Sequence, residues 1–196
     1  MKCYFLMGLP GSGKSFITEK IVKENPDVVV LSMDNIIEDY AKTQNKTYRE
    51  VWAEYIKTAE IVFEKTLNDA VCNHKDIIWD QTNLRSESRL PKIQRLLENK
   101  YQVEGIAVEL SEQEWKSRIQ HREQNGGKTM KPEVLEDMKK SYESPQYSES
   151  FNNIYIVNDN NELALKVQET NVQSNLKAIR SSELSDIVKL SFKHNK

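Results

Sequence analysis

The segment from Gly8 to Ser15 has the residue types and spacing of a phosphate-binding loop. It reads GLPGSGKS, fits the pattern G-x-x-x-x-G-K-[ST], and lies between a short apolar run and a segment of helical pattern. In such a loop, successive backbone N–H groups point into one concavity that holds the phosphates of a nucleotide. We therefore expect a nucleotide site here rather than a glycine-rich turn without a ligand. Its residues are Gly8, Leu9, Pro10, Gly11, Ser12, Gly13, Lys14 and Ser15.

Lys14 and Ser15 carry the side-chain chemistry of this loop. A lysine at this position reaches the outer phosphates of a nucleotide, and the hydroxyl of the next residue is offered to Mg²⁺. The helix that follows adds its unpaired amides and the positive end of its dipole. ATP and Mg²⁺ are therefore the expected ligands of the loop.

Asp34 is the candidate for proton transfer. It comes two residues after Ser32, at the end of the second predicted strand, and open parallel sheets bind ligands at the carboxyl ends of their strands. A carboxylate in that place accepts the proton of an attacking hydroxyl or orients it. The alternative is that Asp34 caps a helix that begins near Asn35, and the two roles are compatible.

Four polar residues end the third predicted strand. Asp80 follows an apolar run and is placed to support Mg²⁺ and its water, while the next three residues offer donors and acceptors to a phosphate or a sugar. The alternative for Asn83 is that it caps the next helix. Two arginines follow and could contact the phosphate of an acceptor. The candidates on this side are Asp80, Gln81, Thr82, Asn83, Arg85 and Arg89.

Two arginines lie four residues apart on one predicted helix. Arg118 and Arg122 precede the Gly126-Gly127 break, and Lys128 lies just beyond it. A guanidinium on a closing lid stabilises the charge that spreads over a transferring phosphoryl group. We therefore expect a lid over about 118–131 that contacts the nucleotide. The alternative is a solvated helix face whose glutamates form ordinary surface pairs with these arginines.

Apolar runs alternate with helical patterns, which predicts βαβ units and a central parallel sheet. Strands are expected at 2–7, 27–32, 76–80, 102–110 and 153–157, and helices at 15–23, 47–73, 86–99, 112–124 and from Pro132 onward. These ranges define an α/β domain over 1–158. Beyond it the composition becomes rich in Asn, Glu, Gln, Ser and Lys, and we interpret 159–196 as a helical tail that caps the domain or serves an oligomer contact.

Composition limits the class of protein. The chain has 196 residues, 38% of them hydrophobic and 30% charged, with a formal net charge of −2 at pH 7. No apolar run approaches the roughly 20 residues that span a bilayer, and the chain enters a core strand at once, so we expect a cytoplasmic protein without a signal peptide. Cys3 and Cys72 lack metal-site spacing and are expected as buried, reduced thiols. A nucleic-acid partner would need a local positive groove.

Taken together, these motifs resemble the kinase domain of bacteriophage-type 5′-polynucleotide kinases, within the AAA_33-type small P-loop kinases. The resemblance covers about 1–158 and implies a three-layer α/β sandwich with a small helical lid, in the cytoplasm of a bacterial or phage-infected cell. The segments that carry it are GLPGSGKS, Ser32-Met33-Asp34, WDQTNL, the lid glycines, Lys131-Pro132-Glu133-Val134-Leu135, Tyr142-Glu143-Ser144-Pro145 and Phe151-Asn152-Asn153-Ile154.

The resemblance assigns roles to the candidate residues. Lys14 and Ser15 would bind phosphate and Mg²⁺, Asp34 would activate a 5′-hydroxyl, and Arg122 would contact the donor phosphates. The acceptor would lie near Asp80, Thr82, Asn83 and Arg89. The implied function is transfer of the γ-phosphate of ATP to a hydroxyl, with the 5′ end of DNA or RNA as the expected acceptor.

Two departures from the family pattern keep other acceptors open. Gly126 stands where the phage enzymes place a second lid arginine, with Lys128 as the nearest cation, and Ile37 or Glu38 stands where they carry an arginine. These departures bear more on a polynucleotide acceptor than on kinase activity. The alternatives are a kinase for a nucleoside, a modified base hydroxymethyl or another small metabolite, and a nucleotide-binding module without transfer activity.

Overall fold

The protein is described by a computed structural model that covers residues 1–125 and 129–166. In chain order, the elements are β1 (Lys2–Gly8), α1 (Lys14–Glu24), β2 (Val29–Leu31), α2 (Met33–Thr43), α3 (Tyr48–Cys72), β3 (Ile77–Asp80), α4 (Ser86–Glu98), β4 (Gln102–Val108), α5 (Glu112–Gln124), α6 (Pro132–Lys140), the 3₁₀ turn η1 (Tyr147–Glu149), β5 (Asn153–Val157) and β6 (Leu163–Leu165).

The strands form one sheet in the order β2-β3-β1-β4-β5-β6. All pairs from β2 to β5 are parallel, and only β6 runs antiparallel to its neighbour. From β1 the chain passes over β3 to β2, toward one edge of the sheet, whereas from β4 it continues to β5, toward the opposite edge. The connections of the neighbouring strands β1 and β4 therefore run in opposite directions. Such a switch point is where open parallel sheets bind ligands, at the carboxyl ends of the strands. The expected parallel α/β sheet is confirmed.

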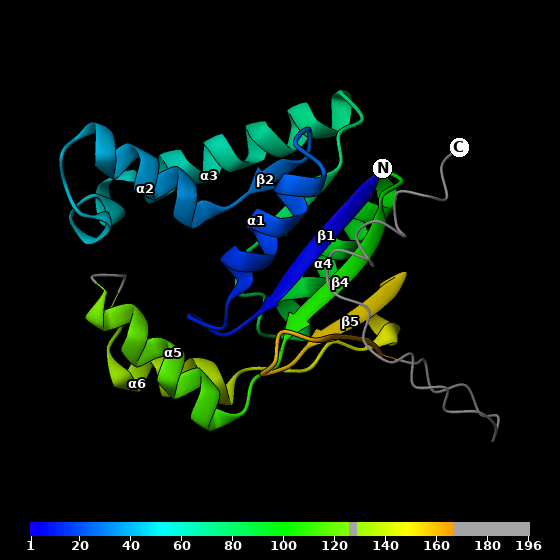
Figure 1. The fold of residues 1–196 in the computed structure, drawn as a ribbon. Coiled ribbons are helices and arrows are strands. Elements are labelled where there is room, and N and C mark those ends of the chain that lie inside the picture. The colour runs from blue at the N-terminus through cyan, green and yellow to red at the C-terminus, as the bar shows by residue number, and fades with distance from the viewer. Residues whose placement is uncertain (126–128, 167–196) are drawn as a thin grey trace, which may run out of the picture.

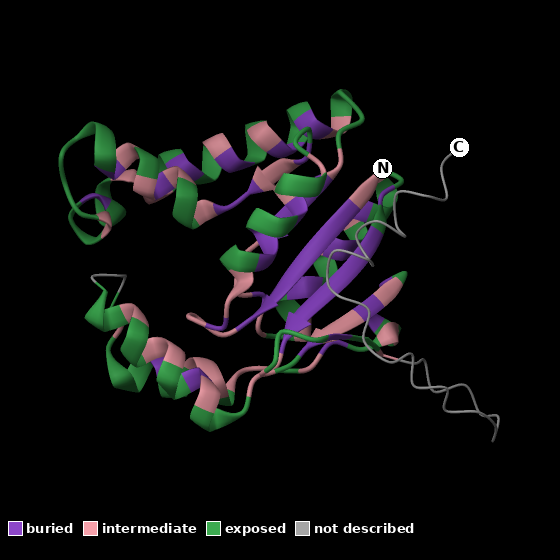
Figure 2. Cartoon of the chain, viewed as in Figure 1, coloured by how far each residue is buried: buried purple, intermediate pink, exposed green. Residues whose placement is uncertain are grey.

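Helices cover both faces of the sheet and make it the middle of three layers (Figure 1). One face packs against α1 through Ile17 and Ile21, and the other packs against α3 and α4. Alternate residues of β1 enter the two cores, as the two-residue period of a strand requires. The central strands are buried on both faces, while the outer surfaces of the helices are exposed (Figure 2).

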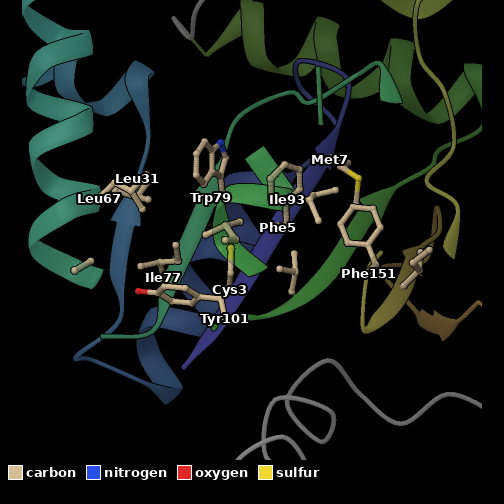
Figure 3. Close-up of a cluster of buried hydrophobic side chains, with 14 of the residues drawn as sticks. Cys3, Phe5, Met7, Leu31, Leu67, Ile77, Trp79, Ile93, Tyr101 and Phe151 are labelled. Carbon is tan, nitrogen blue, oxygen red and sulfur yellow. The ribbon is translucent and has the colours of Figure 1, made fainter. Parts of the chain in front are cut away.

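The core between the sheet and the α3–α4 layer is rich in aromatic rings (Figure 3). Phe5 lies between Trp79 and Phe151, with ring centroids 5.8 and 5.9 Å away. These rings lie below the carboxyl ends of β1 and β3 and provide a rigid base for the polar groups that follow those strands.

Two helical pairs extend beyond the sheet on either side of the loop that follows β1. The α2–α3 hairpin lies on one side and the α5–α6 pair on the other (Figure 1). The α2–α3 hairpin has its own small core, in which Ile37, Ala41, Val51 and Ala59 are buried. These pairs are the elements that can supply side chains to a ligand held at the carboxyl edge of the sheet.

Helix α2 begins before Asp34, and not near Asn35. Ser32 is its N-cap, with a side-chain oxygen that accepts from the backbone N–H of Asn35 at 3.3 Å, and Asp34 lies in the first turn. The alternative that Asp34 caps a helix starting near Asn35 is therefore wrong. Its negative charge still lies near the positive helix end, where it is stabilising.

The region after residue 158 also differs from the expected helical tail. Leu163–Leu165 pairs with β5 as an antiparallel edge strand, with Leu163 opposite Val157 and buried. The sheet therefore continues beyond 158, because the unpaired edge of β5 accepts one more strand. The helical segments expected further along the tail, within 167–196, lie outside the described residues. Within the described ranges, no helix combines the length and apolar character needed to cross a membrane.

Candidate active site

The loop after β1 has a backbone conformation that needs glycine at positions 11 and 13. Gly11 has φ +74° and Gly13 has φ +107°, both in the left-handed region that L side chains rarely adopt. A Cβ on Gly11 would lie 2.5 Å from Cδ1 of Ile119, and one on Gly13 would lie 3.0 Å from a guanidinium nitrogen of Arg118. The loop is therefore enclosed by helix α5 as well as tightly turned.

Two observations show that the loop fits a phosphate ligand. Gly13 is the N-cap of α1 and supplies no side-chain acceptor, so the first amides of that helix can donate to a bound anion. The hydroxyl oxygen of Ser12 is buried and has no hydrogen-bond partner within the described residues. Buried polar atoms normally have partners, and a phosphate in this loop would provide one.

Lys14 folds back over the loop. Its ammonium group donates to the carbonyl oxygens of Gly8 and Leu9, both at 2.9 Å. Burial lowers the pKa of Lys14 to about 8, the nearby carboxylates of Asp80 and Asp34 oppose this change, and Arg122 adds to it. Three charged side chains from three other elements therefore act on one ammonium group at the carboxyl edge of the sheet.

Asp80 ends β3 and is held by helix α1. The Thr18 hydroxyl donates to Oδ2 of Asp80 at 3.0 Å and is also within 3.3 Å of the Lys14 carbonyl oxygen. Burial raises the pKa of Asp80, while the Thr18 hydrogen bond and the charge of Lys14 lower it and Asp34 raises it. The carboxylate is thus oriented by a neutral donor and lies within electrostatic range of Lys14.

Asp34 faces this group from helix α2. It is exposed in the ligand-free protein, and its Oδ1 accepts a hydrogen bond of 2.8 Å from the Tyr48 hydroxyl at the start of α3. The negative charge of Asp34 raises the pKa of both Lys14 and Asp80, which places Asp34 at the same edge of the sheet as the phosphate loop. This is the arrangement that proton abstraction next to a bound phosphate requires.

Helix α5 packs directly on the phosphate loop. The Trp115 indole N–H donates to the Pro10 carbonyl at 2.9 Å, and Arg118 donates to the Ser12 carbonyl at 2.8 Å. Arg118 also forms an ion pair of 2.6 Å with Glu114 and contacts the segment before β6 through the Asp159 carbonyl. Arg118 therefore braces the loop, as well as forming the local pair that was the alternative for it.

Arg122, one turn further along α5, is half buried, and its positive charge lowers the pKa of Lys14. The structure thus brings it toward the phosphate loop, as expected of a residue that contacts donor phosphates. Lys128 and the glycines at 126 and 127 lie outside the described residues.

The polar residues after Asp80 hold the loop connections together. The Asn83 side-chain amide donates to the Leu6 carbonyl at 2.7 Å, and the Thr82 carbonyl accepts from the N–H of Gly8 at 3.0 Å. Lys92 donates to Oε1 of Gln81 at 2.9 Å and to Oδ1 of Asn83 at 2.8 Å. Burial lowers the pKa of Lys92 to about 8.

Asn83 therefore differs from both of its expected roles. It is buried, adopts φ +46°, and ties β1 to the turn after β3, while the N-cap of α4 is Arg85 without a side-chain cap. Gln81 and Thr82 are half buried at the carboxyl edge and remain candidates for ligand contact. Arg85 is exposed at the start of α4.

Arg89 occupies a different place from the expected acceptor contact. Its side chain is completely buried and forms a two-point ion pair with Glu149, with both N–O distances 2.7 Å. Its remaining donors reach the carbonyl oxygens of Asn83, Leu84 and Glu143. Since these protein groups engage the guanidinium, we leave Arg89 out of the candidate acceptor site.

The donor set also fits Mg²⁺ bound together with a nucleotide. Mg²⁺ usually takes one or two protein groups plus substrate phosphates and water. Ser15 at the start of α1 supplies a hydroxyl and Asp80 supplies an oriented carboxylate, and neither is bound to a cation side chain by a described ion pair. Within the described residues, no cluster of three or more His, Cys, Asp or Glu side chains could hold a metal by itself.

Sequence reasoning missed Tyr48 and Lys92, and it expected both cysteines to be buried. Cys3 is buried, but Cys72 is exposed at the end of α3. A signal was present for Tyr48, because it opens the long predicted helix and lies four residues before Trp52. Lys92 gave no such signal, because the neutral oxygens that it contacts come from a turn 9 to 11 residues earlier.

The fold and this loop define a P-loop α/β protein. The chain belongs to the AAA_33 family, described as an AAA domain, whose family model matches residues 4–145.

Among curated proteins, human NEDD4-binding protein 2 is 33% identical over 100 residues. The match covers 50% of this chain and only 5% of that protein, so the chain corresponds to a small part of its relative.

Solved structures share the fold at low sequence identity. A structure from Chloroflexus aurantiacus has TM-score 0.64 and 16% identity, covering 98% of this chain and 94% of that one. A structure from the PezAT toxin–antitoxin system of Streptococcus pneumoniae has TM-score 0.53 and 16% identity, covering 96% and 75%. A gluconokinase from Sinorhizobium meliloti has TM-score 0.51 and 14% identity, covering 100% and 98%.

Proposed function

We propose that this protein is an ATP- and Mg²⁺-dependent kinase that transfers the γ-phosphate to an alcohol. The observation that carries the proposal is the meeting of four charged side chains at the phosphate loop. Lys14 and Arg122 supply positive charge, and Asp34 and Asp80 supply carboxylates. A protein that only bound a nucleotide would need the loop and its lysine, but not a carboxylate on a separate helix facing them.

Asp34 is the group that takes the acceptor proton in this proposal. As the alcohol oxygen attacks the γ-phosphorus, its O–H proton passes to the Asp34 carboxylate. A bond forms between that oxygen and phosphorus, and the bond from phosphorus to the bridging oxygen of ADP breaks. The exposed side chain of Asp34 is accessible to an incoming alcohol.

Lys14 and Arg122 offset the negative charge on the transferring group. The ammonium of Lys14 exchanges its two loop carbonyls for phosphate oxygens, which accept more strongly because they are charged. Ser15 and Asp80 would hold Mg²⁺ together with the nucleotide, and the ion would supply further positive charge against the phosphate oxygens. Helix α5 keeps Arg122 on the loop through the contacts of Trp115 and Arg118.

The 5′-hydroxyl of a polynucleotide is the acceptor that the motif resemblance supports. A nucleoside or another small hydroxyl compound is the second candidate, and one observation favours it. Residues 33–60, which form most of the α2–α3 hairpin beside Asp34, include six acidic and only four basic residues. A surface that tracks a polyanionic strand is normally basic, so this hairpin suits a small acceptor better.

A transfer screen tests the proposal. The protein is incubated with γ-labelled ATP, Mg²⁺ and, separately, 5′-OH DNA, 5′-OH RNA, nucleosides and sugars. Label on the oligonucleotides, with binding that weakens steeply as salt rises, supports the polynucleotide acceptor. Label only on a small compound, with little salt dependence, supports the second candidate. ATP binding without label on any alcohol would contradict the kinase proposal.

A further inference from the structure

A hydrogen bond joins α3 to the Asp34 carboxylate across the α2–α3 hairpin. The Tyr48 hydroxyl donates to Oδ1 of Asp34 at 2.8 Å, joining α3 to a residue 14 positions earlier on α2. Tyr48 is the first residue of α3, so this partner of Asp34 comes from the helix that follows the hairpin turn.

We propose that Tyr48 is a positioning residue, which holds the Asp34 carboxylate in the orientation that receives the acceptor proton. This inference rests on the proposed kinase function, in which Asp34 is the proton acceptor. It adds a residue that touches neither nucleotide nor phosphate loop among the described contacts.

The place of Asp34 makes its hydrogen bonds important for its orientation. It lies in the first turn of α2 with an exposed side chain, and an exposed carboxylate is held in one rotamer by hydrogen bonds rather than by close packing. A hydrogen bond to one carboxylate oxygen fixes the rotation of the group, and therefore the direction of the other oxygen. Reaction rates respond steeply to such placement, since a shift of about 1 Å can cost a factor of about one hundred.

Tyr48 is suited to this role because its hydroxyl stays protonated. Burial raises the pKa of Tyr48 above its ordinary value, and the hydrogen bond and charge of Asp34 raise it further. The hydroxyl is therefore a donor at every pH at which the protein would work.

The chain offers a matched control on the same hairpin. The Tyr40 hydroxyl donates to Glu54 at 3.1 Å, and its ring stacks on Tyr55 at 3.7 Å between centroids. Tyr40→Phe therefore removes one hydroxyl and one carboxylate hydrogen bond without touching Asp34. Tyr48→Phe removes the corresponding group at the proposed positioning residue.

The experiment measures kcat and the KM for ATP with whichever alcohol the transfer screen identifies. Tyr48→Phe is expected to lower kcat roughly ten- to hundredfold while the KM for ATP stays within about twofold. Tyr40→Phe is expected to leave kcat unchanged. The decisive variant is Tyr48→Phe combined with Asp34→Asn. If Tyr48 acts through Asp34, the pair is no slower than Asp34→Asn alone.

The outcomes separate this inference from the proposed function. An unchanged kcat in Tyr48→Phe, or a double variant slower by the product of the two single effects, overturns the positioning role while the kinase stands. Equal losses in Tyr48→Phe and Tyr40→Phe also overturn it, because they indicate a general need for the hairpin. Absence of transfer by the wild-type protein overturns the proposed function. In that case a double-mutant cycle on unfolding free energy still tests the Tyr48–Asp34 bond, and additive losses contradict it.

Discussion

The guanidinium of Arg89 and the carboxylate of Glu149 form a two-point ion pair in the protein interior, with both N–O distances 2.7 Å. The two residues lie 60 positions apart and link helix α4 to the turn before β5. Arg89 is completely buried and Glu149 is 4% exposed. Arg89 also donates to the carbonyl oxygens of Asn83 and Leu84, so the pair fastens the turn after β3 to the 3₁₀ turn η1 before β5.

Glu149→Gln should destabilise the protein strongly, because it leaves the Arg89 charge buried without its partner. Breaking one side of a buried pair costs about 3–5 kcal/mol of unfolding free energy. The matched control is Glu64→Gln. Glu64 of α3 forms a 2.7 Å ion pair with Arg95, which lies on α4 like Arg89, but this pair is exposed. That change should cost less than about 1 kcal/mol. Urea denaturation measures both, and equal losses would contradict the structural role of Arg89.

Nucleotide binding should take up a proton above pH 8. Burial lowers the pKa of Lys14 to about 8 in the ligand-free protein, so the side chain is increasingly neutral above that pH. Bound phosphates favour the charged form, so ATP affinity should fall by up to about tenfold for each pH unit above 8. Calorimetry in two buffers of different ionisation enthalpy measures the proton uptake.

Lys92 provides the control for this titration. Its pKa is also lowered to about 8 by burial, but its described partners are Gln81 and Asn83 rather than the phosphate loop. Lys92→Gln should keep the proton uptake, and Lys14→Gln should abolish it together with the pH dependence of affinity. Uptake that survives in Lys14→Gln would show that another group carries the proton.

Gly11→Ala should force the Ile119 side chain of helix α5 to move, because the new Cβ would lie 2.5 Å from its Cδ1. Ile119→Val removes that atom, and the next nearest atom of the side chain lies at 3.4 Å, an ordinary contact. The double variant should therefore be more stable to urea than Gly11→Ala alone, although Ile119→Val by itself costs about 0.5–1.5 kcal/mol. About 1–2 kcal/mol of backbone strain should remain at φ +74°. Simple addition of the two single losses would contradict the contact.

Thr18→Val should weaken the use of Mg²⁺. The Thr18 hydroxyl donates to Asp80 and lowers a pKa that burial raises, so its removal moves that pKa upward. The acidic limb of the rate profile should move to higher pH, and more Mg²⁺ should be needed for half-maximal rate. Thr66→Val is the control, since the Thr66 hydroxyl bonds only to the Val62 carbonyl of its own helix among described contacts. An unchanged Mg²⁺ requirement in Thr18→Val would remove Asp80 from the proposed metal site.

The sequence predicts well the parts of this site whose causes are local. The phosphate loop is set by glycines and Lys14 within eight residues that follow a strand directly, so motif and geometry coincide. Helix α5 begins at Glu112 as predicted, because Ser111 accepts from the N–H of Glu114 and caps it. Asp80 was placed correctly for the same reason, at the last residue of a short apolar strand.

The misplaced residues depend on partners far away in the chain. Nothing near Arg89 indicates burial, because its partner Glu149 lies on another element. Likewise, Leu163–Leu165 is too short and too polar in context to predict a strand, and it becomes one only because β5 offers an open edge. The bond from Tyr48 to Asp34 exists because α2 and α3 turn back on each other, which a helical period cannot reveal.

The central claim is that Asp34 takes the proton of an alcohol beside a nucleotide held by Lys14. A single-turnover assay of γ-phosphate transfer by Asp34→Asn, with ATP affinity measured in parallel, tests it most directly. General base catalysis contributes roughly a factor of 10²–10⁴, so transfer should slow by at least about one hundredfold while ATP affinity stays within about twofold. Transfer at close to the wild-type rate would contradict the account.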